Sequence, residues 1–343
     1  MRHDVYSDVG KTTNPKFGVN WSPVRGLLLR GSYGTSFRAP LISQIYGNSN
    51  NLFVQTYQNP NGAPIVGVAL SGQNLNLRPE KAKTWSVGGD LDLSNRLRIS
   101  ATYFNVEYTN QVEAYLSDLA ILSREAQFAG TGIIYRGADA AAQVAAAQAA
   151  GVAVNGVLPN PITLFVDGRN NNLGVSNTEG IDFVVNYTLP TDNIGTFLFN
   201  ASGTYLTRYE VAITDAAPLV DRRNTIFFPL KFKARASVAW DFDPVRIQFQ
   251  ATHVNGYKNN AIAVPQQVKS YTPVDVSIAW NLGGANGSGL LSGVTLGAEV
   301  RNLFDLDAPY VNLAPSGNGS GGYDATAASP IGRLVAVSLR ANF

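Results

Sequence analysis

The sequence predicts an all-β fold of long antiparallel strands, and three observations predict it. Apolar and polar residues alternate with a period of two in one stretch after another, as in strands with two different faces. The connections between these stretches alternate between short and long. The composition favours strands and turns, with 33 glycines, 15 tyrosines and 16 phenylalanines, while charged residues make up only 15% of the chain.

The alternation rule predicts about eleven strands along the 343 residues. In the stretch from Leu230 to Trp240, every second residue is apolar, and the residues between them include Lys231, Lys233 and Arg235. A tight turn follows at 241–244, and the pattern then repeats. The predicted strands are 16–21, 26–36, 84–93, 97–103, 181–187, 197–204, 230–240, 245–252, 274–281, 294–301 and 331–343.

The connections indicate which class of β protein this is. Short ones are near 22–26, 93–96, 189–195, 241–244 and 282–292; long ones are near 37–82, 110–174, 209–228, 258–270 and 305–330. Short turns at one end and long loops at the other are typical of an outer-membrane β-barrel. A short Ala-rich helix is expected at 139–150, inside the second long loop.

The apolar faces favour lipid over a soluble core. No charge lies in the central part of any of them, where Lys or Arg would cost about 2–4 kcal/mol in a membrane. All four tryptophans lie on apolar faces near strand ends: Trp21, Trp240 and Trp280 at the short-turn side and Trp85 at the long-loop side. Aromatic girdles at both membrane interfaces predict this placement. We therefore expect an antiparallel transmembrane barrel segment in contact with outer-membrane lipid.

Several function classes are disfavoured. The chain has no cysteine and two histidines, and we find no nucleophile motif, paired carboxylates or metal-ligand spacing. Asp241 and Asp243 suit a turn beside Pro244 better than catalysis. A net charge of +2 without a long basic run argues against nucleic acid as a partner. We predict no enzyme, no catalytic residue, no cofactor and no metal.

Five short patterns, in one order along the chain, resemble those of TonB-dependent outer-membrane receptors. They are Pro15-Lys16 before a strand that ends at Trp21-Ser22-Pro23, GSYGTSFRAP at 31–40, NLNLRPEKAKTWSVG at 74–88, NLFD at 302–305, and Gly332-Arg333 before the terminal Phe343. Each pattern alone is weak, and their order makes the resemblance specific. One position departs from the family, because Ser86 stands where a glutamate is usual.

The resemblance implies the C-terminal half of a receptor barrel. Plugged outer-membrane transporters have 22 strands, so about eleven would form half a barrel. In the family, a plug domain and the first barrel half precede this region, and a TonB-type energy-coupling protein acts through that earlier part. The resemblance also assigns Phe343 to recognition by the barrel assembly machinery.

The domain prediction is one barrel domain over residues 1–343, with no plug domain and no signal peptide, since residues 1–4 are polar and no apolar run follows. The resemblance implies energy-coupled uptake of a ferric siderophore, haem, cobalamin or a glycan, by a fragment that is not active alone. A passive porin-like barrel, a non-functional truncated remnant and a soluble enzyme or lectin-like protein are the alternatives.

Candidate ligand-binding residues lie in the loops and on the polar face. The loop 46–62 is rich in aromatic residues and asparagine, which suits contact with a sugar or siderophore. The polar face carries more basic than acidic residues, which favours an anionic cargo, unless these residues contact the plug or each other. Arg38 is either a solvated loop charge or a partner of Glu80. The candidates are Arg38, Tyr46, Tyr57, Lys231, Lys233 and Arg235.

Overall fold

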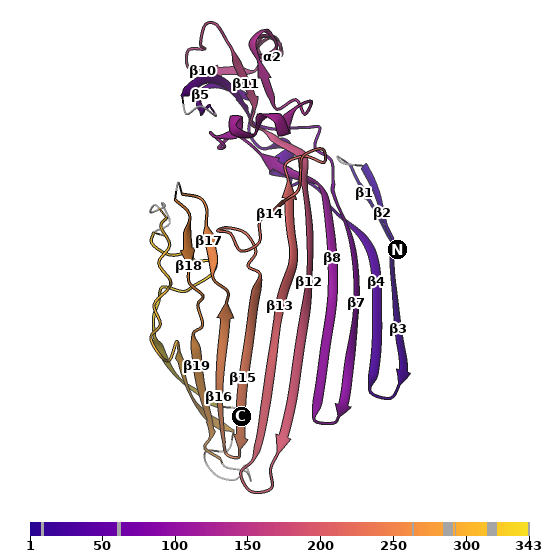
Figure 1. The fold of residues 1–343 in the computed structure, drawn as a ribbon, viewed down its shortest axis with the longest axis vertical. Helices are drawn as coiled ribbons and strands as arrows, with labels where there is room; N and C mark the ends of the chain where they lie inside the picture. Colours follow the sequence, from indigo (N-terminus) through magenta and orange to yellow (C-terminus); the bar gives the residue numbers. More distant parts are fainter. Residues whose placement is uncertain are drawn as a thin grey trace.

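The computed structural model describes residues 1–7, 10–59, 63–262, 264–283, 291, 293–313 and 321–341. Within them, eleven strands lie side by side in one sheet, which we call the wall, in their order along the chain (Figure 1). The strands are β3 (Lys16–Val24), β4 (Leu27–Arg38), β7 (Glu80–Ser94), β8 (Leu97–Ala114), β12 (Asn170–Pro190), β13 (Thr196–Ala212), β15 (Phe232–Phe242), β16 (Val245–Val254), β19 (Val274–Asn281), β20 (Val294–Arg301) and β21 (Leu334–Ala341).

Every neighbouring pair in the wall is antiparallel, which confirms the predicted fold class of about eleven antiparallel strands. The two-residue strand β14 (Val220–Asp221) pairs only with β13. The short turns hold tightly packed backbones. Gly26 has φ +87°, and a Cβ there would lie 2.4 Å from the carbonyl oxygen of Asp92, so only glycine fits this turn.

The strand register aligns the two faces of the wall. One polar row crosses six strands, from Arg30 through Gly88, Thr102, Asp182 and Thr204 to Lys233. On the opposite face, Val19, Val87 and Val337 are 67%, 60% and 72% exposed. In a water-soluble sandwich, apolar side chains such as these would be covered by a second sheet. In a membrane barrel they face the lipid. The wall is therefore a transmembrane β-barrel segment.

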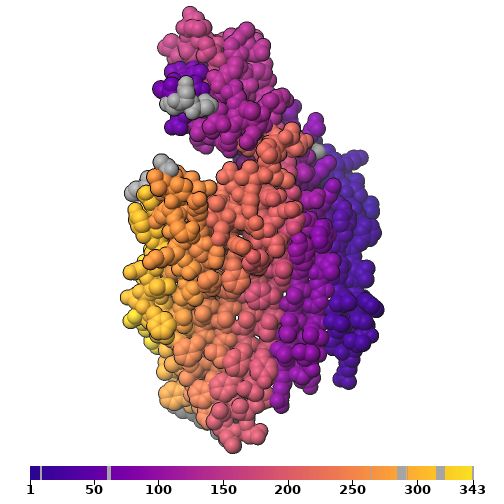
Figure 2. Space-filling view, in the orientation of Figure 1, coloured from indigo at the N-terminus to yellow at the C-terminus, as the bar shows by residue number. Residues whose placement is uncertain are grey.

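The two longest loops fold together into a separate body above the wall, which we call the lobe (Figures 1 and 2). Its sheet has the order β10-β5-β6-β11-β9. The first loop supplies the antiparallel pair β5 (Asn51–Gln58) and β6 (Pro64–Ser71), preceded by the short helix α1 (Ile42–Tyr46). The second loop supplies η1 (Ile121–Phe128), β9 (Ile134–Arg136), α2 (Gly137–Ala149), β10 (Ala153–Asn155) and β11 (Leu164–Asp167).

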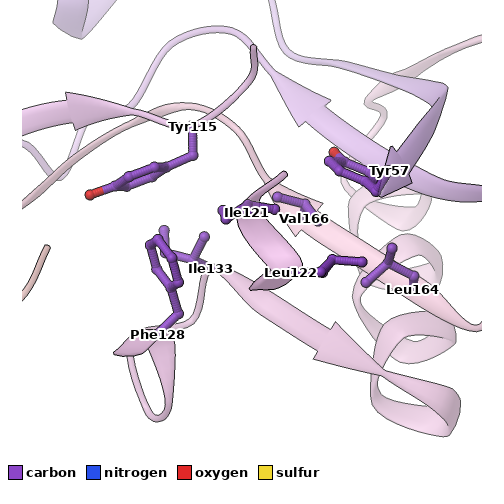
Figure 3. Close-up of a cluster of buried hydrophobic side chains, with 8 residues drawn as sticks. All are labelled: Tyr57, Tyr115, Ile121, Leu122, Phe128, Ile133, Leu164 and Val166. Carbon is purple, nitrogen blue, oxygen red and sulfur yellow. The ribbon is translucent and has the colours of Figure 1, made fainter. Parts of the chain in front are cut away.

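The lobe has a water-excluded core of its own. One cluster combines Tyr57 of β5 with Ile121, Leu122 and Phe128 of η1 and with Leu164 of β11 (Figure 3). A second cluster on the other side of the sheet buries α2. Its members are Leu52, Val68, Leu70, Ala140, Val144 and Phe165. The helix expected at 139–150 is confirmed as α2, whereas the five strands of the lobe had been expected to be loop.

Two further hairpins flank the wall. The pair β1 (Arg2–Tyr6) and β2 (Gly10–Asn14) precedes β3, and β17 (Tyr257–Asn259) pairs with β18 (Gln266–Val268) beyond β16. Leu230, which the alternation places on the apolar face of a strand, instead packs with Tyr257 and Val268 in a loop core, because β15 begins only at Phe232. Among the described residues, no helix is long and apolar enough to cross a bilayer.

Candidate functional site

An ion pair between an exposed arginine and a buried carboxylate joins the tops of β4 and β7. Arg38 ends β4, and the register sets it opposite Glu80, the first residue of β7. Its Nε and Nη2 donate to the two carboxylate oxygens of Glu80, the second bond being 2.6 Å long. Glu80 also accepts from the phenol of Tyr108 and from the backbone N–H of Val112, both at 2.7 Å. Its side chain is only 2% exposed.

Four donors therefore satisfy one buried carboxylate, and these bonds fasten the tops of β4, β7 and β8 to one another. Of the two readings that the sequence left open for Arg38, the pair with Glu80 is the one observed. Neither Tyr108 nor Val112 has a sequence signal that connects it to this cluster, because the contacts depend on the β7–β8 register. Ligand binding by Arg38, whose side chain is 53% exposed, stays a prediction.

The three basic candidates at the start of β15 do not share one environment. Lys233 pairs with Thr204 and Arg235 with Ser202 on the polar face, and both side chains are exposed. Lys231 precedes β15, and its backbone carbonyl accepts from the N–H of Leu206. Its ammonium lies 5.2 Å from the ring centre of Tyr205, and ligand binding by Lys231 stays a prediction. Tyr205 pairs with Phe232, and the alternation of the strand places Phe232 on the apolar face.

The two tyrosine candidates of the first loop differ in the same way. Tyr46 ends α1 and is 53% exposed, so it is available to a ligand. Tyr57 is fully buried in the core of the lobe. A ligand that contacts the closed lobe would not reach this ring, so the expectation of an exposed Tyr57 is wrong. An apolar environment on both sides of β5 explains the burial.

The tryptophans of the short-turn end form a regular pattern. The residues paired with Trp21 on successive strands can be followed across six strand pairings to β15. They reach β15 at Ala234, which lies six residues before Trp240. Two pairings further, the row of Trp240 meets β19 at Ile278, two residues before Trp280. The tryptophans are therefore offset by one residue per strand. If the strands tilt by about 35°, within the range for membrane barrels, this offset places the three tryptophans at the same height along the barrel axis. This geometry supports one lower interface for all three rings.

Aromatic and charged side chains mark the upper limit of the apolar face. Trp85 lies opposite Tyr33, and its ring centre is 5.5 Å from that of Tyr103. On the same face, Glu179 accepts from the phenol of Tyr103 at 2.6 Å and from Arg208 at 3.0 Å. Charges thus begin directly beyond the aromatic side chains at the long-loop end.

The remaining expectations have no test in these contacts. Phe343 lies outside the described residues, and so does the tip of the loop 46–62 at residues 60–62. Within the described part of the chain, no group of three or more His, Asp or Glu side chains is arranged to hold a metal ion.

Known proteins resemble this chain in both sequence and fold. Residues 1–303 match the family described as TonB dependent receptor-like, beta-barrel. A variant of the ferric enterobactin receptor PfeA from Pseudomonas aeruginosa, in complex with enterobactin, has a TM-score of 0.68 and 17% identity; 99% of this chain covers 42% of that one. The siderophore receptor PirA from Acinetobacter baumannii gives 0.66 and 16%, with the same coverage.

The FrpB iron transporter from Neisseria meningitidis is a more distant neighbour. Its TM-score is 0.55 and its identity 12%, over 97% of this chain and 40% of that chain. At these identities the likeness is one of fold. The chain thus spans about two fifths of the length of the solved structures it resembles.

Proposed function

Because this chain belongs to the TonB-dependent receptor-like β-barrel family, we propose that it forms part of an outer-membrane receptor that takes up a scarce nutrient with energy from a TonB-type coupling protein. One observation carries the proposal. The wall has an apolar face with exposed Val19, Val87 and Val337, and a polar face with Arg30, Asp182 and Lys233 in one row. Such a wall separates lipid from a polar lumen.

A ferric siderophore is the cargo that we place first, ahead of haem, cobalamin and glycans. The similar structures are those of a ferric enterobactin receptor, a siderophore receptor and an iron transporter. Lys233 and Arg235 are exposed on the polar face, which supports an anionic cargo. Arg38 and Tyr46 at the long-loop end are the proposed outer contacts.

The proposed partners follow from the edges of the wall. Every residue of β3 and β21, the two edge strands, is exposed. An open sheet edge is not viable in hydrocarbon, because each unpaired backbone group costs several kcal/mol. We propose that the first barrel half and a plug domain, from an earlier part of a longer polypeptide, close this wall. The barrel assembly machinery would insert the whole, with Phe343 as its signal.

Growth with one nutrient limiting at a time (iron for siderophores and haem, cobalamin, or the carbon source for glycans) tests the proposal. The native gene is deleted, restored with its surrounding reading frame intact, and assayed on ferric siderophores, haem, cobalamin and glycans, with and without the coupling protein. We expect one cargo to restore growth only when both the gene and the coupling protein are present. Uptake without the coupling protein would favour the passive porin-like barrel, and no uptake of any cargo would favour the non-functional remnant.

A fractionation experiment tests the location independently of the cargo. A barrel should be recovered in the outer membrane and should migrate differently on gels before and after heating. A water-soluble monomer with one sharp unfolding transition would contradict the membrane assignment.

A further inference from the structure

A cavity of about 400 Å³ lies where the lobe meets the wall. The top of β8, the start of the second long loop and the end of β13 form three of its sides, and the segment 213–228 forms the fourth. Its volume lies in the range of small-molecule sites. None of the residues that the sequence singled out as ligand contacts lines it.

Two buried hydrogen-bond donors in this cavity lack an acceptor. The phenol oxygen of Tyr115 and Nε of Arg222 are buried, and neither has a hydrogen-bond partner among the described residues. Tyr115 is 7% exposed, and Figure 3 shows its oxygen directed away from the other labelled side chains of the core. Burial, and next the neighbouring Glu113, raise the pKa of Tyr115, which keeps the phenol protonated. Buried polar groups are rarely left unpaired, so both donors call for an acceptor.

The charges around the two donors select one kind of acceptor. Asp118 is paired with Arg124, so this carboxylate and this guanidinium largely cancel. The guanidinium of Arg222 lies 5.7 Å from the ring centre of Phe228 and pairs with no carboxylate in the described residues. Glu113 also lines the cavity, and burial raises its pKa, which favours its neutral form and weakens its repulsion of an anion. The charges therefore favour a ligand with a single anionic group.

Apart from Gln111, Gln127 and Tyr209, the remaining lining is apolar. Ile213, Pro218 and Val220 present side chains to the cavity from the segment opposite Tyr115. A ligand of the right size would place its anionic end at the two donors and its hydrocarbon part against these three residues. Such a ligand would contact both the lobe and the segment 213–228, adding to the packing of Ile213 on the lobe core and the hydrogen bond from Thr214 to the backbone carbonyl of Gln127.

We propose that this cavity binds a small organic anion with one carboxylate and a compact apolar body. The carboxylate oxygens accept from the phenol of Tyr115 and from Nε of Arg222. Bound in this way, the anion fastens the lobe to the segment 213–228. The proposal does not rest on nutrient uptake, because a receptor whose cargo binds elsewhere would still hold the anion. The anion site and the proposed uptake function can therefore fail separately.

Fluorine NMR with 4-fluorobenzoate tests the site on the complete polypeptide that contains this chain and closes the barrel, reconstituted in lipid nanodiscs, with empty nanodiscs as the blank for partition into lipid. The neutral isostere 4-fluorobenzamide has the same ring and lacks the charge. We expect the benzoate to bind at least tenfold more tightly than the amide. Equal binding of the two compounds, or no binding of the benzoate beyond the blank, would overturn the proposal.

Variants locate the binding. Arg222→Gln should weaken benzoate binding at least tenfold, and Tyr115→Phe about threefold or more, because each removes one donor. Arg96→Gln, an exposed arginine in a short turn at the other end of the wall, is the matched control and should leave binding unchanged. Heat-modifiable gel mobility verifies that each variant is folded. Unchanged affinity in both folded cavity variants would overturn the site.

Discussion

The wall and the lobe bury their apolar side chains against different partners. In the wall, Val87 and Val337 are 60% and 72% exposed in the isolated chain. In the lobe, Leu52 and Leu164 are completely buried. A single-layer sheet has no opposite layer, so its apolar face must be covered by lipid, whereas the lobe folds its sheet against α2 and η1. The lobe can therefore be expected to respond to mutation like a water-soluble protein, and the wall like a membrane protein.

A substitution that creates a cavity in the core of the lobe should cause the largest loss of stability. Leu164→Ala removes a fully buried side chain and should destabilise the lobe by about 2–5 kcal/mol. The matched change in the wall, Val87→Ala, should cost less than about 1 kcal/mol because its side chain lies at a surface. Amide hydrogen exchange of β6 and β11 against that of β7 measures the two responses. Equal losses of protection would contradict the distinction.

Introducing a charge should make the wall, and not the lobe, the more sensitive region. Val87→Lys places an ammonium on the lipid-facing side and should cost about 2–4 kcal/mol. Ser86→Lys, one residue earlier and on the polar face, should be nearly neutral. Urea unfolding in lipid vesicles, followed by unheated gel mobility, provides the measurement. If the two lysine variants unfold together, our assignment of the two faces is wrong.

The Arg38–Glu80 pair lies where the wall meets the lobe and should give a smaller effect. Glu80→Gln keeps the shape but replaces a buried carboxylate that accepts four bonds, and should cost about 1–3 kcal/mol. Exchange protection should fall at the tops of β4, β7 and β8 and remain unchanged in β11. Tyr108→Phe, which removes one of the four donors, should show a weaker form of the same pattern.

The smallest effect is a dependence on pH that is confined to the lobe. Arg136 donates to both carboxylate oxygens of Glu125, at 2.9 and 2.7 Å, and these bonds lower the pKa of Glu125. The pair therefore stabilises the lobe above the ordinary glutamate pKa of about 4.3. This contribution disappears as the pH falls through the lowered pKa of Glu125 in the folded protein.

Both side chains of this pair are 37% exposed, so the loss should be only about 0.5 kcal/mol. Lobe exchange rates measured from pH 6 to pH 3 should show it, and Arg136→Gln should abolish the dependence. A dependence that survives in Arg136→Gln would assign the titration to another group.

The wall was predictable because period-two alternation is a local signal that survives in every strand. The lobe was not, because β9 and β10 have three residues each and are held by tertiary pairing rather than by pattern. Within the lobe, α2 was the element that the sequence predicted, because its segment is rich in alanine. In hindsight, the apolar runs of β6 and β11 were the available signal for a second core. Tyr57 was misplaced because its burial depends on how the two loops fold together, which is not encoded locally.

The pairing inside the lobe also constrains the order of assembly. β11 lies parallel to β6, and β10 lies parallel to β5, yet β7 and β8 occur between the two halves along the chain. During synthesis, the β5–β6 hairpin must wait with an open edge until the whole β7–β8 hairpin has been made. Such long-range parallel contacts form late in folding. The lobe is thus assembled from two loops on opposite sides of the β7–β8 hairpin, so its completion depends on that hairpin to hold both loops at the same end of the wall.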